Sequence, residues 1–298
     1  MELTVVIVSY NARAELEKCL EVLFARTHLD SLEVVVADNA SDDGSREMLA
    51  ELFADRIKLI PCEANLGFGQ ASNLGWRQAR SSLVLFLNPD AMVGERALDR
   101  MVSLLRERPE VGVVGPLLRY EDGAVQMSAG RMMSLAAEIG QKTWNGGYAR
   151  GRGPLKKAVE RIYSRERFVD WVSGACLMTR RDLLETTGGF DETFFLYAED
   201  VDLCARIRAT GARVLFTPRA EVVHLVGRSV AKDRSRAIFE AQRSRLYFYT
   251  KHHGGLQAAL LRVYLAVKSV VALLLRPRDR AAHRSVLRLI VSGVDPWP

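Results

Sequence analysis

Polar side chains stand at the ends of three of the first four apolar, strand-like runs of the chain. They are Ser9, Tyr10 and Asn11 after the first run, Asp38 after the second, and Asn88 and Asp90, on either side of a proline, after the fourth. Ends of this kind are where α/β enzymes bind ligands, so two carboxylates and several amides are expected to converge on one sheet edge. Two alternatives stay open: Asp38 could open an Asx turn in DNASDDG, and Asp90 could cap a helix beginning near Gly94.

A second group of candidate residues lies in the stretch FFLYAEDVDLCARI. Glu199, Asp200 and Asp202 follow an aromatic run there. Acids in a first helical turn complement the helix dipole, but three of them beside aromatic residues exceed what capping requires, so at least one is expected to be functional. His224 ends the run EVVH, and a lone histidine of this kind is more often a packed or hydrogen-bonded residue than a ligand.

The elements that must position these residues alternate along the chain. The strand-like runs TVVIVSY, LEVVVADN, IKLIPC and LVLFLNPD are separated by amphipathic helical patterns, and VGVVGPLL adds a further strand. This alternation predicts an α/β fold with a mostly parallel sheet covered by helices on both faces. The pattern dissolves over 126–167, and within it the segment WNGGYARGRGPLKK (144–157) is expected to form an exposed loop or short irregular helices. It returns with a helix ending near Gly211 and two separate strands, ARVLFTP and AEVVHLV.

Composition and charge place the chain among globular proteins with a basic tail. The 298 residues are 48% hydrophobic and 26% charged, enough for one large domain with an appendage. Residues 229–298 carry 13 Lys+Arg against 4 Asp+Glu, whereas the preceding residues carry 29 against 32. The tail therefore favours an acidic partner.

The chain's cysteines and its N-terminus favour the cytosol. The four cysteines show no metal-ligand spacing and have apolar neighbours, which predicts reduced, packed thiols. The start MELTVVIVSYN has too short an apolar run for a signal peptide and predicts a first strand.

The tail contains an apolar stretch, 256–275, that is long enough to span a bilayer. Arg262 and Lys268 argue against spanning, at about 2.5 to 3.5 kcal/mol each near the bilayer centre. On a helical wheel the polar positions fall within an arc of about 140°, which predicts an amphipathic helix. These positions are Gln257, Arg262, Lys268, Ser269, Arg276 and Arg280. Binding to an anionic membrane surface, packing on the main domain and a homodimer contact all stay open.

The order of motifs closely resembles glycosyltransferase family 2, and within it the bacterial rhamnosyltransferase-type enzymes. The resemblance rests on VSYN, VVVADNASDDGS, NLGFGQASNLG, LFLNPDA, WVSGACLMTRRDLLETTGGFDETFFLYAEDVDLCARIRATG and VVH, and it covers about residues 3–228. It implies a GT-A fold over 1–228, with a Rossmann-like nucleotide half (about 1–125) and an acceptor half (about 126–228). Residues 229–298 would follow as a basic segment of amphipathic helices.

The resemblance also implies a site for a nucleotide-sugar donor. Ser9, Tyr10 and Asn11 would lie at the donor, and Asp38 would bind a pyrimidine base. Asn65 and Asn73 would line the pocket, with Gly67 and Gly69 letting the backbone approach the ligand. The family's Asp-x-Asp motif is reduced here to Asn88-Pro89-Asp90, so Asp90 would bind the cation with Asn88 at most assisting. His224 matches a metal-binding histidine found in some members, and this set suits Mg²⁺ or Mn²⁺.

For catalysis, the resemblance makes Asp200 the general base of the family's Glu-Asp pair, with Glu199 beside it. The base takes the proton of the acceptor hydroxyl while this hydroxyl attacks the anomeric carbon with inversion. Trp171 and the Gly174 backbone would shape the acceptor side, together with Glu199 and Asp200. The implied reaction moves a sugar, rhamnose from dTDP-rhamnose, to a glycan or a polyprenyl-diphosphate-linked saccharide for the cell envelope. The enzyme would then be cytoplasmic and peripheral to the inner face of the cell membrane.

Three other functions remain to be weighed against this one. The donor could be a UDP-hexose or another nucleotide-sugar. A nucleotidyltransferase with the same Rossmann-like half would leave the GGFDE…ED stretch without a role. A nucleic-acid binder is disfavoured because the basic tail contains no recognised nucleic-acid motif.

Overall fold

The computed structural model describes residues 1–135, 153–225, 234–275 and 277–292. The chain divides into two compact units, each considered by itself. The first comprises 1–192 and 200–226, and the second comprises 193–199 and 227–298. Sequence reasoning did not anticipate that the short segment 193–199 groups with the C-terminal helices.

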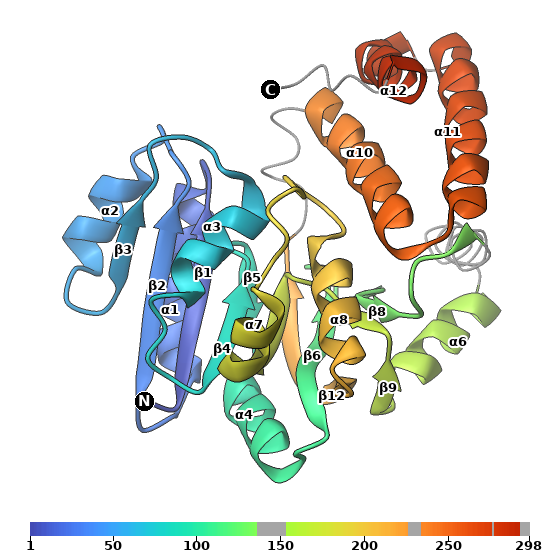
Figure 1. Cartoon of the computed structure of the whole chain (residues 1–298). Helices are drawn as coiled ribbons and strands as arrows, with labels where there is room; N and C mark the ends of the chain where they lie inside the picture. The colour runs from blue at the N-terminus through green and yellow to red at the C-terminus, as the bar shows by residue number, and fades with distance from the viewer. Residues whose placement is uncertain (136–152, 226–233, 276, 293–298) are drawn as a thin grey trace. The chain divides into compact units, whose positions relative to one another are not determined.

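The first half of the larger unit is a parallel α/β arrangement, as predicted (Figure 1). Its strands are β1 (Leu3–Ser9), β2 (Leu32–Asp38), β3 (Lys58–Pro61) and β4 (Leu83–Leu87), which pair in parallel in the order β3-β2-β1-β4. The helices between them are α1 (Arg13–Arg26), α2 (Ser45–Leu52) and α3 (Gly67–Trp76). Parallel pairing brings the carboxyl ends of these strands to one edge.

The second half of the sheet breaks the parallel order. Strand β11 (Cys176–Arg180) lies between β4 and β6 (Val111–Arg119) and is antiparallel to both. Strand β12 (Arg213–His224) is parallel to β6, and β5 (Ala91–Val93) closes the edge antiparallel to β12. The sheet is therefore mostly parallel, as expected, with one reversed strand in its middle.

Short strands and helices complete this unit. They are α4 (Ala97–Glu107), β7 (Val125–Gln126), β8 (Ala129–Gly130), α6 (Gly153–Tyr163), β9 (Arg167–Val169), β10 (Trp171–Val172), α7 (Arg181–Thr187) and α8 (Glu199–Ala209). Regular elements lie within 126–167, where no pattern was read from the sequence: β7, β8, α6 and the start of β9. Of the segment 144–157, expected to be a loop or short irregular helices, residues 144–152 lie outside the described ones, and the remainder begins the regular helix α6. The two strands expected around Pro218 are one strand, β12, whose pairing register shifts between Thr217 and Glu221.

Hydrophobic side chains cover both faces of the sheet. Alternate residues of β1 divide between two cores: Leu3, Val5 and Ile7 belong to the core that includes residues of α1 and α4, whereas Val6 belongs to the core on the other face, where it packs closely against Gly75 of α3. Period-two alternation of side chains along a strand gives this division. The four cysteines are buried and reduced, as predicted.

The smaller unit is a group of helices, α10 (Arg234–His252), α11 (Gly255–Leu275) and α12 (Arg280–Ser292), with a 3₁₀ turn at Pro277–Asp279. Helix α11 packs against both α10 and α12. The segment 193–199 is bound within this unit, because Phe194 stacks edge-on against Tyr247 and the Leu196 carbonyl accepts a hydrogen bond from the Ser244 hydroxyl at 2.7 Å. The single amphipathic helix expected to reach Arg280 ends at Leu275, and Arg280 opens α12 instead.

Candidate active site

The carboxyl ends of β1 and β2 bring the first predicted residues together. Ser9 and Asp38 are paired in register, and both are fully buried. The backbone N–H of Asn39 donates to the Ser9 carbonyl at 2.8 Å, which continues the ladder one residue beyond the strands. Tyr10, next along the chain, is 43% exposed. The strand-end convergence expected from the sequence is therefore present for these residues.

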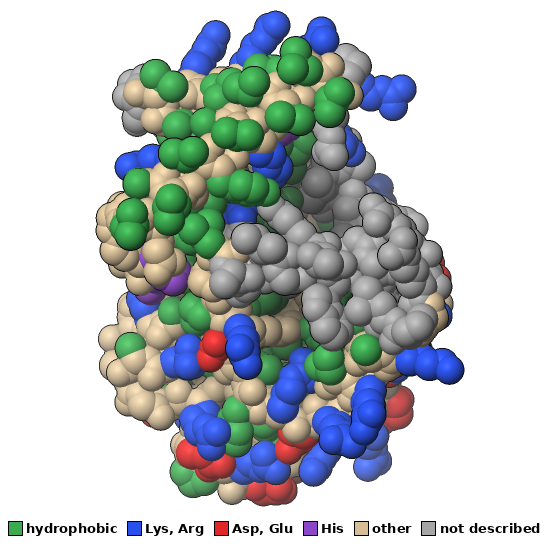
Figure 2. All heavy atoms as spheres, turned by 90° about the vertical axis from the view of Figure 1, so that its right-hand side faces the viewer, with side chains coloured by type: hydrophobic (Ala, Val, Ile, Leu, Met, Phe, Trp, Pro, Cys, Tyr) green, Lys and Arg blue, Asp and Glu red, His purple; other side chains and the backbone are tan. Residues whose placement is uncertain are grey.

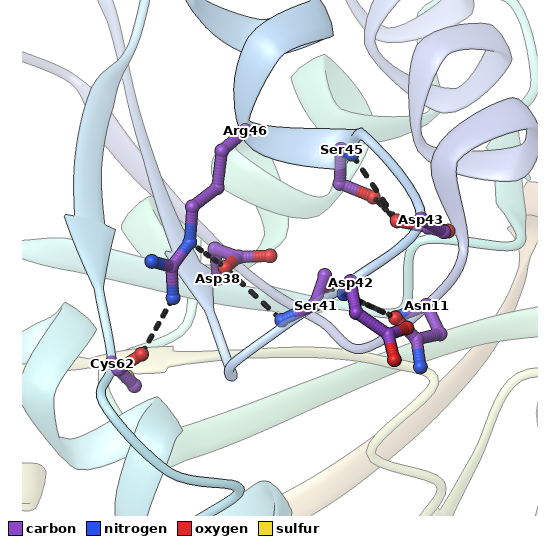
Figure 3. Close-up of polar contacts among 8 residues, drawn as sticks. All are labelled: Asn11, Asp38, Ser41, Asp42, Asp43, Ser45, Arg46 and Cys62. Carbon is purple, nitrogen blue, oxygen red and sulfur yellow. Dashed lines mark hydrogen bonds and ion pairs between the residues drawn. The ribbon is translucent and has the colours of Figure 1, made fainter.

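Asp38 forms an ion pair with Arg46, a residue that sequence reasoning did not include (Figure 3). Arg46 lies in the first turn of α2; its Nε donates to Asp38 Oδ2, and a terminal nitrogen donates to the Cys62 carbonyl at 2.6 Å. The hydrogen bonds with Asp38 raise the pKa of Arg46. Asp38 Oδ2 also accepts the Ser41 N–H at 3.3 Å, so the turn interaction considered from the sequence is present as well.

The other oxygen of Asp38 is left available. Oδ1 is buried and has no hydrogen-bond partner among the described residues. A buried carboxylate oxygen without a donor is costly, so an N–H group of a ligand would satisfy it. Arg46 therefore holds one oxygen and leaves the second as an acceptor.

Asn11 shapes the loop that follows β2. Its backbone N–H donates to the Ser41 hydroxyl at 3.0 Å, and its side-chain oxygen accepts the Asp42 N–H at 2.8 Å (Figure 3). Asn11 has φ of 51°, a left-handed conformation that asparagine tolerates better than most residues. Asn11 thus ties the β1 end to the β2 end through their loops.

Asn39 and Asn65 connect the β2 end to the start of α3. The Asn39 amide donates to Asn65 Oδ1 at 2.9 Å, and its oxygen accepts the Leu66 N–H at 2.8 Å. Gly67 opens α3 with φ of 79°, a conformation that disfavours residues with a Cβ, and Gly69 is buried two residues further on. Asn65 and Asn39 therefore support the loop at the edge of the expected pocket.

Asn73 differs from the expectation that it lines the donor pocket. It is fully buried, and its amide donates to the Phe190 carbonyl at 2.8 Å and to Glu192 at 2.9 Å. Its oxygen accepts the Trp76 indole N–H at 2.8 Å and the Phe190 N–H at 2.9 Å. Because all these polar contacts are made within the fold, we assign Asn73 a structural role and omit it from the site.

Asn88, Asp90 and His224 come together from the β4 end and the β12 end. His224 Nε2 lies 3.2 Å from Asp90 Oδ1 and 3.2 Å from the Asn88 amide nitrogen. Asp90 and His224 are almost fully buried. The helix-cap alternative for Asp90 is wrong, because β5 follows it and α4 begins only at Ala97.

Gln126 of β7 orients the imidazole and was missed by sequence reasoning. Its side-chain oxygen lies 3.0 Å from His224 Nδ1. An amide oxygen only accepts, so the proton belongs on Nδ1, and Nε2 presents a lone pair next to Asp90. Gln126 thus fixes the tautomer that a metal-binding histidine requires.

These residues fit a divalent cation. Two lone-pair atoms 3.2 Å apart match the edge of an octahedron with ligands at about 2.1 Å, which is about 3 Å. Among the described residues no group of three or more His, Cys, Asp or Glu side chains could hold a metal. Asp90 and His224 would therefore need ligand oxygens, such as those of a diphosphate, to complete the coordination.

Asp200 is anchored by two backbone N–H groups. Gly174 donates to Oδ2 and Val201 donates to Oδ1, each at 2.8 Å. Burial raises the pKa of Asp200, and these hydrogen bonds offset part of that rise. A Cβ on Gly174 would lie 3.3 Å from the Asp200 Cβ, so glycine permits this close approach. An acid with a raised pKa and a fixed orientation has the properties of a general base.

The neighbouring acids have distinct positions. Glu199 is buried and begins α8, after Tyr197 and Ala198, which are both left-handed with φ of 71° and 64°. Two successive non-glycine residues in this conformation store strain of a kind that concentrates at functional sites. Asp202 is fully buried and paired with Arg206 at 2.7 Å, so it stabilises α8.

Trp171 is half-buried on β10, which pairs with β8. Its indole N–H donates to the Arg131 carbonyl at 2.8 Å. The side chain is partly exposed, and its place on the acceptor side stays a prediction.

The larger unit thus combines a strand edge that carries acids and amides with the buried, anchored carboxylate of Asp200, on the GT-A fold of glycosyltransferases. Mannosyltransferase PcManGT from Pyrobaculum calidifontis, solved in complex with GDP-Man and Mn²⁺, superposes with a TM-score of 0.62, covering 99% of this chain and 87% of that one at 20% identity. The structure of S. aureus TarS 1–349 superposes with a TM-score of 0.54, covering 99% and 92% at 14% identity. These structures share the fold with this chain.

The chain belongs to glycosyl transferase family 2, whose model matches residues 4–188. The N-acetylglucosaminyl-diphospho-decaprenol L-rhamnosyltransferase of Mycobacterium tuberculosis is 32% identical over 303 residues, covering 97% of each chain. Rhamnosyltransferase WbbL of Escherichia coli is 25% identical, covering 74% of this chain and 82% of WbbL. The chain is therefore a family-2 glycosyltransferase.

Proposed function

We propose that this protein transfers rhamnose from dTDP-rhamnose to a hydroxyl of a polyprenyl-diphosphate-linked saccharide, with inversion at the anomeric carbon. The observation that carries this proposal is the full-length identity of 32% to a rhamnosyltransferase that acts on N-acetylglucosaminyl-diphospho-decaprenol. Because this acceptor is linked to a membrane lipid, the enzyme would work at the cytoplasmic face of the cell membrane, in the synthesis of an envelope polysaccharide.

The pyrimidine base of the donor nucleotide would bind at the carboxyl end of β2. Asp38 Oδ1, which is buried without a donor, accepts the N3–H of the pyrimidine, while Arg46 keeps Oδ2 engaged. Ser9, Tyr10 and Asn11 form the neighbouring wall of this pocket, and Gly67 lets the α3 backbone approach the ligand. Thymine and uracil both present N3–H, so these contacts accept either nucleotide.

The diphosphate would bind beside Asp90 and His224, which would hold Mg²⁺ or Mn²⁺. Such a cation would stabilise the negative charge of the leaving diphosphate. Gln126 fixes the ring so that Nε2 faces Asp90, and the Asn88 amide lies 3.2 Å from the same Nε2 lone pair, which the cation would take in its place. Asp90 and His224 would thereby hold the diphosphate end of the donor while its glycosidic bond to phosphate breaks.

Asp200 would act as the general base on the acceptor. It removes the proton of the acceptor hydroxyl as that oxygen forms its bond to the anomeric carbon and the nucleoside diphosphate leaves. The raised pKa strengthens this base, and the Gly174 and Val201 N–H groups aim it. Glu199 and Trp171 would contact the acceptor sugar.

The proposal is tested by incubating the purified chain and Mn²⁺ with a synthetic polyprenyl-diphosphate N-acetylglucosamine and one donor at a time. Mass spectrometry should show addition of one deoxyhexose from dTDP-rhamnose and release of dTDP, and Asp90→Ala should abolish this product. If the sugar were transferred only from UDP-hexoses, the donor would be a UDP-hexose and not dTDP-rhamnose. Release of inorganic diphosphate from dTTP and a sugar 1-phosphate, without any glycoside, would identify a nucleotidyltransferase instead.

A further inference from the structure

Helix α11 carries an unusual share of the molecule's exposed hydrophobic surface. Nine of the sixteen exposed large hydrophobic residues in the described part of the chain lie on this one helix. They are Leu256, Leu260, Val263, Tyr264, Val267, Val270, Val271, Leu274 and Leu275. We call these nine residues the α11 apolar face. Exposed patches of this kind mark interaction sites in soluble proteins.

The α11 apolar face lies opposite the side by which the helix packs on its neighbours. The buried residues of α11 are Ala258, Leu261, Leu265, Ser269 and Ala272. At about 100° per residue they form a stripe centred about 150° from the centre of the apolar face, which itself spans about 140°. The arc predicted to be polar thus contains the packed side, where Ser269 Oγ lies 3.3 Å from His283 Nδ1 of α12. The helix therefore packs through the buried stripe and exposes the α11 apolar face.

Basic residues border this face. Lys268 lies beside one margin of the α11 apolar face, about 90° from its centre line, whereas Arg262 lies toward the far side of the helix, about 150° from that line. On α12, Arg280, Arg284 and Arg288 recur at every fourth position and are exposed, so they form one row. Figure 2 shows hydrophobic side chains gathered over α11, with Lys and Arg side chains along the margin of the same face.

Acidic residues do little to offset this charge. Residues 229–298 carry 13 Lys+Arg against 4 Asp+Glu. Two of these acids, Glu240 and Asp279, are buried and paired with Arg243 and Arg234 at 3.2 and 2.9 Å. The surface of the smaller unit is therefore strongly positive around an aliphatic stripe.

We propose that the α11 apolar face inserts into the headgroup and acyl boundary of an anionic membrane leaflet, with α11 lying parallel to the membrane plane. The hydrophobic side chains enter the leaflet, while the α12 arginine row and Lys268 contact lipid phosphates. The inference concerns lipid binding alone and does not depend on the proposed donor or acceptor.

Two other occupants fit the observations less well. Helix α11 is long and apolar enough to span a bilayer, at about 31 Å. Spanning would place Arg262 and Lys268 in the hydrocarbon core and would strip away α10 and α12, on which its other side packs. A second copy of the chain would bring like charges together around the stripe, whereas anionic phosphates complement them.

The test is co-sedimentation of the full-length protein with vesicles of phosphatidylcholine alone or mixed equally with phosphatidylglycerol. The unmodified protein should sediment with the mixed vesicles. The double variant Val263→Asn/Val267→Asn changes two exposed residues, so folding is retained, and partitioning should fall about tenfold per residue. The matched control Leu52→Asn/Ile162→Asn changes exposed apolar residues of the larger unit and should leave partitioning unchanged.

The charge contribution is measured separately. Arg284→Gln/Arg288→Gln should weaken binding to mixed vesicles about fivefold per residue and leave binding to phosphatidylcholine unchanged. Equal sedimentation of the unmodified protein and the Val263/Val267 variant would overturn the proposal. The proposal would also be overturned if the unmodified protein did not bind vesicles and was a dimer by analytical ultracentrifugation, while the Val263/Val267 variant was a monomer. A second copy of the chain would then cover the α11 apolar face.

Discussion

Replacing Asp200 by Asn separates its role as a base from its role in the fold. Both carboxylate oxygens accept backbone N–H groups, from Gly174 and Val201, each at 2.8 Å. An amide has one acceptor oxygen, so one of these N–H groups loses its acceptor and faces the amide NH₂ group. The substitution is therefore nearly isosteric in shape but removes both the proton acceptor and one charged hydrogen bond.

The two losses differ in size and in the quantity that reports them. Removing a general base lowers kcat by about 10² to 10⁴, equivalent to about 3 to 5 kcal/mol in the activation free energy. Losing a hydrogen bond to a charged acceptor lowers the free energy of unfolding by about 1.5 to 3 kcal/mol, and relief from burying the charge offsets part of this. We expect kcat to collapse while the folded protein persists.

The assay measures kcat at saturating donor across a range of pH. The base must be deprotonated, so activity is lost as pH falls through the pKa of Asp200, which burial raises above the usual value of about 3.9. The acid limb of the wild-type profile should accordingly lie above that value. The residual activity of Asp200→Asn should show no such limb.

Two neighbours serve as controls. Asp202→Asn loses the buried ion pair with Arg206 and should lower stability while retaining kcat. Glu199→Gln tests the adjacent acid. Wild-type kcat in Asp200→Asn, together with a collapse in Glu199→Gln, would show that the base is Glu199 and that this reasoning is wrong.

Three further predictions concern the donor side and the fold. Gln126→Leu frees the His224 ring and should weaken Mn²⁺-dependent donor binding about 10- to 100-fold by calorimetry; unchanged metal affinity would remove Gln126 from the site. Arg46→Met should raise the KM for the donor with little change in kcat, and Arg46→Lys should raise this KM less because it keeps the positive charge. An unchanged KM for Arg46→Met would show that Asp38 needs no cationic partner for donor binding. Asn73→Leu should lower the free energy of unfolding by about 3 kcal/mol or more in urea, because it leaves buried donors and acceptors unpaired, and a stable variant would contradict its structural role.

The sequence predicted the parallel half of the sheet because its strands are continuous apolar runs with amphipathic helices between them. The position of Asp38 follows from this rule, since a parallel strand end fixes where its last residue lies. The reversed strand β11 was not predictable in the same way. Its five residues, Cys176–Arg180, form an apolar run like the others, and only pairing decides their direction.

The contacts that complete the candidate site connect residues far apart in the sequence. Gln126 meets His224 across 98 positions, and Asn73 meets Phe190 across 117. Arg46 lies close to Asp38 in sequence, but a polar residue in a first helical turn gives no indication of whether it turns toward a strand end. Such partners become visible only when the fold brings them together.

The order of strands in the sheet has a consequence for synthesis on the ribosome. Strands β1 to β4 can pair with one another as soon as residues 1–87 have been synthesised. Strand β6 can join this sheet only after β11 has been made, because β11 lies between β4 and β6. The short strand β5, directly after Asp90, pairs only with β12 within the described sheet, at Ala91 opposite His224. The proposed pocket for the nucleotide base can therefore form more than a hundred residues of elongation before the pairing of β5 with β12 fixes the position of Asp90. The proposed diphosphate site would then be completed in one late step, and a chain truncated before His224 would lack it.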